Sequence, residues 1–101
     1  MSKKILSDAI DELEDNITSL KAKKFIIEEK IVNLKKDKFT LEHNIKKLEI
    51  SMGGGNIALK DNLIEQNKNI EEKINELRFK LRKINDKLNE AEDLDAELNS
   101  R

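Results

Sequence analysis

Residues 45–63 read IKKLEISMGGGNIALKDNL, and they place three consecutive glycines between two helix-forming segments. Each glycine in a helix interior costs about 1 kcal/mol relative to alanine, so three in a row favour a break. Gly53 is well placed as the C′ residue that ends one helix, and Asn56 as the N-cap of the next. The chain has no proline, so these glycines are its strongest helix breakers.

A 3-4 hydrophobic spacing runs upstream of the glycines, over seven consecutive heptads in residues 3–52. The d positions are Leu6, Leu13, Leu20, Ile27, Leu34, Leu41 and Leu48, and the a positions are Lys3, Ile10, Ile17, Lys24, Ile31, Lys38, Ile45 and Met52. Twelve of these fifteen residues are apolar. A repeat this strict is typical of a coiled-coil helix. A seven-residue period drifts around the surface of a straight helix, so the apolar residues stay on one face only if the helix supercoils around a partner.

The same spacing resumes downstream. The d positions are Asn56, Leu63, Ile70, Leu77, Ile84, Ala91 and Leu98, and the a positions are Lys60, Asn67, Ile74, Leu81, Leu88 and Asp95. We therefore predict a single all-α coiled-coil domain over residues 1–101. It consists of one helix at about 3–52, a glycine turn at 53–55 and a second helix at about 56–99.

The phase of the two repeats favours an antiparallel two-helix coiled-coil hairpin. When the chain folds back at Gly54, facing residue numbers sum to 108 and every a position meets a d position, as in Ile31 with Leu77. The alternative is an extended parallel coiled-coil dimer, which Ile at a with Leu at d also suits. That rod needs a skip in the repeat, because Met52 and Lys60 are successive a positions eight residues apart.

Several layers of the predicted seam are half polar, namely Leu13–Asp95, Lys24–Ile84, Lys38–Ile70, Leu41–Asn67 and Leu48–Lys60. A lysine in such a layer buries its stem while its amine reaches a carboxylate, and Lys38 can reach Glu42 or Glu71. A lone hairpin with this seam would be marginally stable. We therefore expect two hairpins to pack into a four-helix bundle, as a homodimer or a higher homo-oligomer.

Bulky apolar residues lie off the seam. Phe25, Val32 and Phe39 occupy three successive b positions, Ile26 adjoins them, and Phe79 lies on the outer side of the second helix at nearly the same height. All three phenylalanines of the chain thus lie outside the seam. We interpret these five residues as an interface for a second hairpin or another protein.

A second candidate surface surrounds the turn, where the residues are Met52, Gly53, Gly54, Gly55, Asn56, Ile57 and Leu59. The apolar residues of this tip either pack against one another to hold the loop or contact a partner. The sequence leaves both interpretations open.

The charges are segregated along the chain. Twenty basic and twenty-one acidic residues give a net charge of −1, so the chain as a whole does not attract polyanions. Residues 1–20 hold two lysines against five carboxylates, and residues 84–101 hold two cations against six, which predicts an acidic open end of the hairpin. The middle carries a basic belt, formed by Lys23, Lys30, Lys35, Lys36, Arg78 and Arg82.

The basic belt suits three kinds of partner: an acidic protein, the acidic end of another copy, or a nucleic acid backbone. No motif that reads DNA or RNA accompanies it, which makes nucleic acid the least favoured of the three.

Residues for catalysis or metal binding are missing from the sequence. The chain has no cysteine, and its single histidine, His43, falls at a solvent-facing f position. The usual nucleophile–base pairs and soft metal-ligand sets therefore cannot be assembled. The glycines lack the following Lys-Ser/Thr of a phosphate loop. We predict a protein that is not an enzyme and that needs no cofactor and no metal.

The sequence shows no signal peptide and no transmembrane run, so we expect a cytoplasmic protein, or one in the host cytoplasm if it is viral. Lysine outnumbers arginine 17 to 3, and Ile and Asn are abundant. This bias is typical of an AT-rich genome, which suggests an accessory protein of a low-GC bacterium or a phage.

The leading hypothesis is a non-enzymatic coiled-coil protein–protein interaction module. Such a module would act as a small assembly, scaffold or structural subunit, or as an inhibitor that binds a partner. One alternative is a chaperone-like helical hairpin, since the paired helices resemble prefoldin. Prefoldin subunits insert β-hairpins between their helices, and residues 51–57 are too few for that. The other alternative is a nucleic-acid-associated protein that uses the basic belt.

Overall fold

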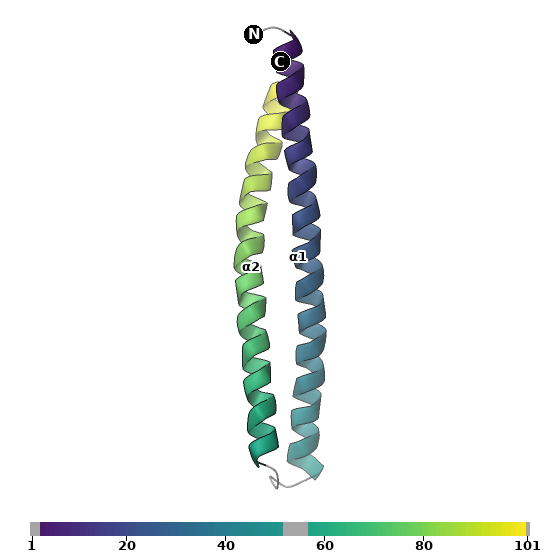
Figure 1. The fold of residues 1–101 in the computed structure, drawn as a ribbon, viewed down its shortest axis with the longest axis vertical. Coiled ribbons are helices and arrows are strands. Elements are labelled where there is room, and N and C mark those ends of the chain that lie inside the picture. The colour runs from purple at the N-terminus through teal and green to yellow at the C-terminus, as the bar shows by residue number, and fades with distance from the viewer. Residues whose placement is uncertain (1–2, 52–56, 101) are drawn as a thin grey trace. The chain divides into compact units, whose positions relative to one another are not determined.

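The computed structural model describes residues 3–51 and 57–100, and these form two α-helices and no strand. Helix α1 spans Lys3–Ser51 and helix α2 spans Ile57–Asn99 (Figure 1). Neither helix contains an internal glycine or proline, which explains why each continues without a break. The predicted turn residues lie outside the described residues, namely Met52, Gly53, Gly54, Gly55 and Asn56.

The two helices form two compact units, each made of a segment of α1 and the facing segment of α2. Unit 1 comprises Met1–Glu28 with Phe79–Arg101, and unit 2 comprises Glu29–Arg78. Within each unit the two helix segments lie side by side and run in opposite directions (Figure 1). The prediction of an all-α antiparallel coiled-coil hairpin is therefore confirmed, in place of the extended parallel rod.

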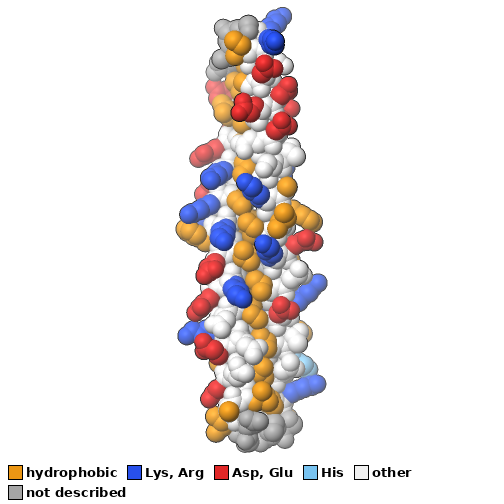
Figure 2. Space-filling view, in the orientation of Figure 1, with side chains coloured by type: hydrophobic (Ala, Val, Ile, Leu, Met, Phe, Trp, Pro, Cys, Tyr) orange, Lys and Arg blue, Asp and Glu red, His pale blue; other side chains and the backbone are white. Residues whose placement is uncertain are grey.

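Burial follows the predicted heptads. Of the predicted a and d residues that the structure describes, all are buried or half-buried except Lys3, which is exposed. Outside the predicted seam, the described residues that are half-buried are Ala9 and Asn85. In each unit, hydrophobic side chains follow the line between the two helices and charged side chains flank it (Figure 2). The seven-residue period thus identifies the packed face of each helix.

Unit 1 is held by an apolar cluster formed by Ile17, Leu20, Leu88 and Ala91. Leu13 and Ile84 are partly buried and pack against this cluster. Its members include two pairs that the predicted register sets opposite each other, Ile17 with Ala91 and Leu20 with Leu88. The antiparallel register is therefore the predicted one in this unit.

Unit 2 has a more polar seam. Its buried hydrophobic residues are Ile31 and Ile74, from α1 and α2 respectively. Ion pairs also join the two helices here: Lys38 Nζ lies 2.8 Å from Glu71 Oε1, and Lys60 Nζ lies 3.0 Å from Glu49 Oε1. In both pairs the lysine is a half-buried seam residue, and the glutamate is an exposed residue one position beyond the facing one.

Two seam layers contain a buried polar atom without a hydrogen-bond partner, Oδ1 of Asn67 in unit 2 and Oδ1 of Asp95 in unit 1. These layers are the predicted half-polar pairs Leu41–Asn67 and Leu13–Asp95. Such atoms cost stability, because a buried acceptor has lost its hydration without gaining a protein partner. Within residues 3–51 and 57–100, neither helix contains a segment that is apolar and long enough to span a bilayer.

Candidate protein-interaction surface

The five residues predicted to form an interface are all exposed. Phe39 is 72% exposed, Phe25 63% and Phe79 56%, while Ile26 and Val32 are each about half exposed. Exposed apolar side chains scattered singly are ordinary, but bulky aromatic side chains that stay outside a folded seam mark surfaces that bind other molecules. The apolar side chains of the described seam are in contrast all aliphatic, so the two classes of apolar side chain are separated in space.

Val32 and Phe39 come together in unit 2, one heptad apart on α1. With Lys35, Lys36 and Thr40 they line a shallow groove, which we call the basic aromatic groove. The Thr40 hydroxyl donates a hydrogen bond of 3.1 Å to the Lys36 carbonyl oxygen, so this polar group is already satisfied within the helix. The groove therefore presents two apolar side chains next to two lysines.

Phe25, Ile26 and Phe79 belong to unit 1. The ammonium of Lys83 lies over the Phe79 ring, 4.5 Å from its centroid. This i, i+4 cation–π contact is favourable because the ring face carries negative charge density. The exposed ring of Phe79 thus already carries a cation on one face.

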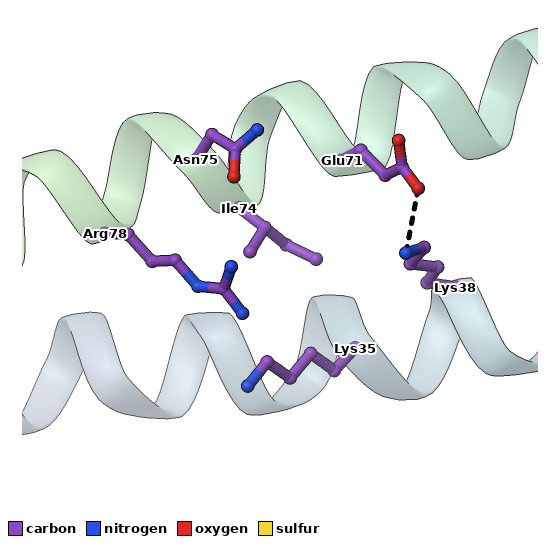
Figure 3. Close-up of a pocket in the computed structure, with 6 residues that line it drawn as sticks. All are labelled: Lys35, Lys38, Glu71, Ile74, Asn75 and Arg78. Atoms are coloured by element: carbon purple, nitrogen blue, oxygen red, sulfur yellow. Dashed lines mark ion pairs between the residues drawn. The ribbon is translucent and has the colours of Figure 1, made fainter.

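A cleft between α1 and α2 in unit 2 is lined by Lys35, Lys38, Glu71, Ile74, Asn75 and Arg78 (Figure 3). Its volume is about 460 Å³. Ile74, which is only 4% exposed, gives it an apolar element, and the charged side chains surround that residue. The cleft lining contains three cations and one carboxylate, so it carries net positive charge.

The positive charge of Lys38 is balanced by carboxylates inside this cleft. It contacts Glu71 at 2.8 Å and Glu42, one turn along α1, at 3.6 Å. The hydrogen bond that Lys38 donates to Glu71 is the main cause that raises the pKa of Lys38. Desolvation opposes this rise, and the charges of Glu71 and Glu42 add to it. The prediction that Lys38 reaches Glu42 or Glu71 is confirmed, and it reaches both.

Lys35 and Arg78 supply the remaining charge of the cleft. Arg78 extends from α2 toward α1, and Lys35 runs along α1 on the same side as the Arg78 guanidinium (Figure 3). Among the described residues, no carboxylate lies within ion-pair distance of either one. Two cations that share a cleft repel each other, and an anion placed between them would relieve that repulsion. Lys35 also lines the basic aromatic groove, so the cleft and the groove adjoin.

The other residues of the basic belt do not gather at one site. Lys23 lies in unit 1, where it lines a groove that also contains Lys87, Glu90 and Leu94. Lys30 and Arg82 are exposed. At the start of α2, the tip residues Ile57 and Leu59 are exposed as well. Of the predicted belt residues, Lys35 and Arg78 line the cleft, and Lys35 and Lys36 line the basic aromatic groove.

Within the part of the chain that the structure describes, no group of three or more Asp, Glu or His residues is arranged to hold a metal ion. Comparisons of the chain with protein-family models, with curated proteins and with solved structures found no match. A function for this chain must therefore be argued from its own surface.

Proposed function

We propose that this chain is a coiled-coil protein–protein interaction module, acting as an assembly, scaffold or structural subunit or as an inhibitor that binds a partner. The observation that carries this proposal is the exposure of all three phenylalanines, each more than half accessible on a hairpin whose described apolar seam residues are aliphatic. Aromatic residues are common anchors of protein interfaces, since one ring buries a large area with few rotatable bonds.

The energetics support a docking role for these side chains. Burial of a phenylalanine is worth about 1.5–3 kcal/mol, so anchoring through Phe39 and Val32 supplies a substantial part of a binding free energy. The lysines beside them add charge complementarity, which favours an acidic partner and speeds association. Within this proposal, packing of two hairpins into a four-helix bundle is one way to cover the aromatic residues.

The test is a double substitution, Phe25→Lys with Phe39→Lys, compared with the control Ala22→Lys with Asn33→Lys. All four positions are exposed on α1, so both variants add two charges without touching the seam. We expect the phenylalanine variant to lose oligomer mass, or to lose a protein partner that the wild type captures, while the control behaves as the wild type. Light scattering and affinity capture measure these two outcomes, and circular dichroism verifies the helices.

Equal mass and equal capture for all three proteins would contradict the proposal. Binding of duplex DNA or RNA that persists in the phenylalanine variant would favour the nucleic-acid alternative instead, because phosphate contacts use the lysines and not the rings.

A further inference from the structure

We infer that a second copy of this chain docks on the basic aromatic groove through an acidic face near the end of α2, formed by Glu90, Asp93 and Leu94. This inference rests on the proposed function, because it names the partner of that surface. It joins unit 1 of one copy to unit 2 of another.

The groove and the adjoining cleft together define what the ligand must carry. Val32 and Phe39 accept an apolar side chain, and Lys35 and Lys36 lie beside it. Lys35 also lines the cleft, where Lys35 and Arg78 have no carboxylate within ion-pair distance among the described residues. A complementary helix therefore needs one exposed apolar residue with carboxylates on the same face.

The acidic face of α2 carries this combination. Leu94 is 46% exposed and lies outside the seam. Glu90 precedes it by four residues, so the two side chains share one side of the helix. Both line the same groove of unit 1, whose other charged residues are Lys23 and Lys87. Asp93 is exposed next to Leu94, and residues 84–101 hold six carboxylates against two cations.

Charge complementarity favours a copy of the chain over a nucleic acid. A polyanion would meet the basic groove but would be repelled by the acidic segments of the same chain, whose net charge is −1. A second copy brings its carboxylates on a helix together with the apolar residue that the groove accepts. Arginine binds carboxylates in a bidentate manner, which suits Arg78 to one of them.

The contact is heterologous, because the groove and the acidic face are different surfaces. It is also partly exposed to solvent, so salt screens it. We therefore expect self-association of the wild type that weakens as ionic strength rises. A bundle held only through aromatic contacts would lack this salt dependence.

The experiment uses charge reversal at both surfaces. The groove variant carries Lys35→Glu and Lys36→Glu, and the face variant carries Glu90→Lys and Asp93→Lys. The matched controls are Lys68→Glu with Lys73→Glu and Glu65→Lys with Glu72→Lys, which change the net charge equally at other exposed positions of α2. Sedimentation velocity measures self-association over a concentration series at low and high salt, and circular dichroism verifies folding.

We expect each variant alone to self-associate about tenfold more weakly or worse, since like charges then face each other. An equimolar mixture of the two variants should recover association. The unaltered acidic face of one variant meets the unaltered groove of the other, and the two reversed surfaces also complement each other. The controls should associate as the wild type does.

A wild type that stays monomeric, variants that associate as the wild type does, or a mixture without recovery would each overturn the inference. Binding of a duplex oligonucleotide that is lost in the groove variant, in a chain that does not self-associate, would overturn it as well. The proposed function is tested separately. If the phenylalanine variant loses binding while both charge variants keep it, the interaction module stands and this docking mode is wrong.

Discussion

Unit 1 and unit 2 share the same two helices and the same heptad repeat, yet their seams are held differently. Unit 1 has an apolar cluster in which Leu20 and Leu88 face each other. Unit 2 has Ile31 and Ile74 as its buried hydrophobic residues and has ion pairs across the seam at Lys38 and Lys60. A buried leucine contributes about 1.5–3 kcal/mol, whereas a partly exposed ion pair contributes about 0–1 kcal/mol.

This contrast indicates a division of roles along one coiled coil. Apolar layers in unit 1 supply stability, and the polar layers of unit 2 restrict the register at the expense of stability. The same polar character leaves Lys35 and Arg78 in an open cleft, next to the groove of Val32 and Phe39. The unit with the more polar seam thus contains both the cleft and the basic aromatic groove.

The largest expected effect is the loss of packing in unit 1. Leu88→Ala should lower the free energy of unfolding by about 2–5 kcal/mol, because it removes a buried side chain and leaves a cavity. The matched change in unit 2 is Leu41→Ala, at a half-buried position opposite Asn67, and it should cost less. Urea denaturation followed by circular dichroism measures both. A larger loss for Leu41→Ala would show that unit 2 holds the hairpin together.

A change of intermediate size removes a polar atom from the seam of unit 2. Asn67→Leu should raise the free energy of unfolding by about 1–3 kcal/mol, because Oδ1 of Asn67 is buried without a hydrogen-bond partner. The control is Asn62→Leu at an exposed position, which should stay within about 0.5 kcal/mol of the wild type. Thermal melts compare the three proteins. Destabilisation by Asn67→Leu would mean that the amide is satisfied by a group from another chain.

The smallest expected effect concerns pH and Lys38. The pKa of Lys38 is raised above its ordinary value of 10.5 in the folded chain, chiefly by the Glu71 hydrogen bond. The associated stability is therefore fully present below that ordinary value and is lost as pH rises through the folded value. The stability difference between the wild type and Lys38→Met should shrink on the alkaline side. A difference that stays constant from neutral to alkaline pH would contradict the role of this ion pair.

The heptad repeat predicted the fold closely, because a seven-residue period states directly which face of each helix is packed. It predicted the burial of Leu20 and Leu88 and the reach of Lys38 toward Glu71. It also assigned Lys3 to the seam, but Lys3, the first residue of α1, is exposed.

The surface was less predictable, because periodicity gives the direction of a side chain but not its rotamer. Lys35 and Arg78 were predicted as members of a basic belt, and their convergence in a cleft depends on how each long side chain extends. The cation–π contact of Lys83 with Phe79 was also missed. Its i, i+4 spacing could have suggested it, but many Lys and aromatic residues with this spacing make no such contact.

The register of the seam also has a consequence for chain entropy. Glu49 and Lys60, which pair in unit 2, are 11 positions apart in the sequence, whereas Ile17 and Ala91 in the unit 1 cluster are 74 apart. Each doubling of a closed loop costs about 0.6 kcal/mol more in lost conformational freedom. The more polar seam of unit 2 therefore lies where the loss of conformational entropy on loop closure is smaller. The apolar cluster of unit 1 lies where that entropy loss is larger.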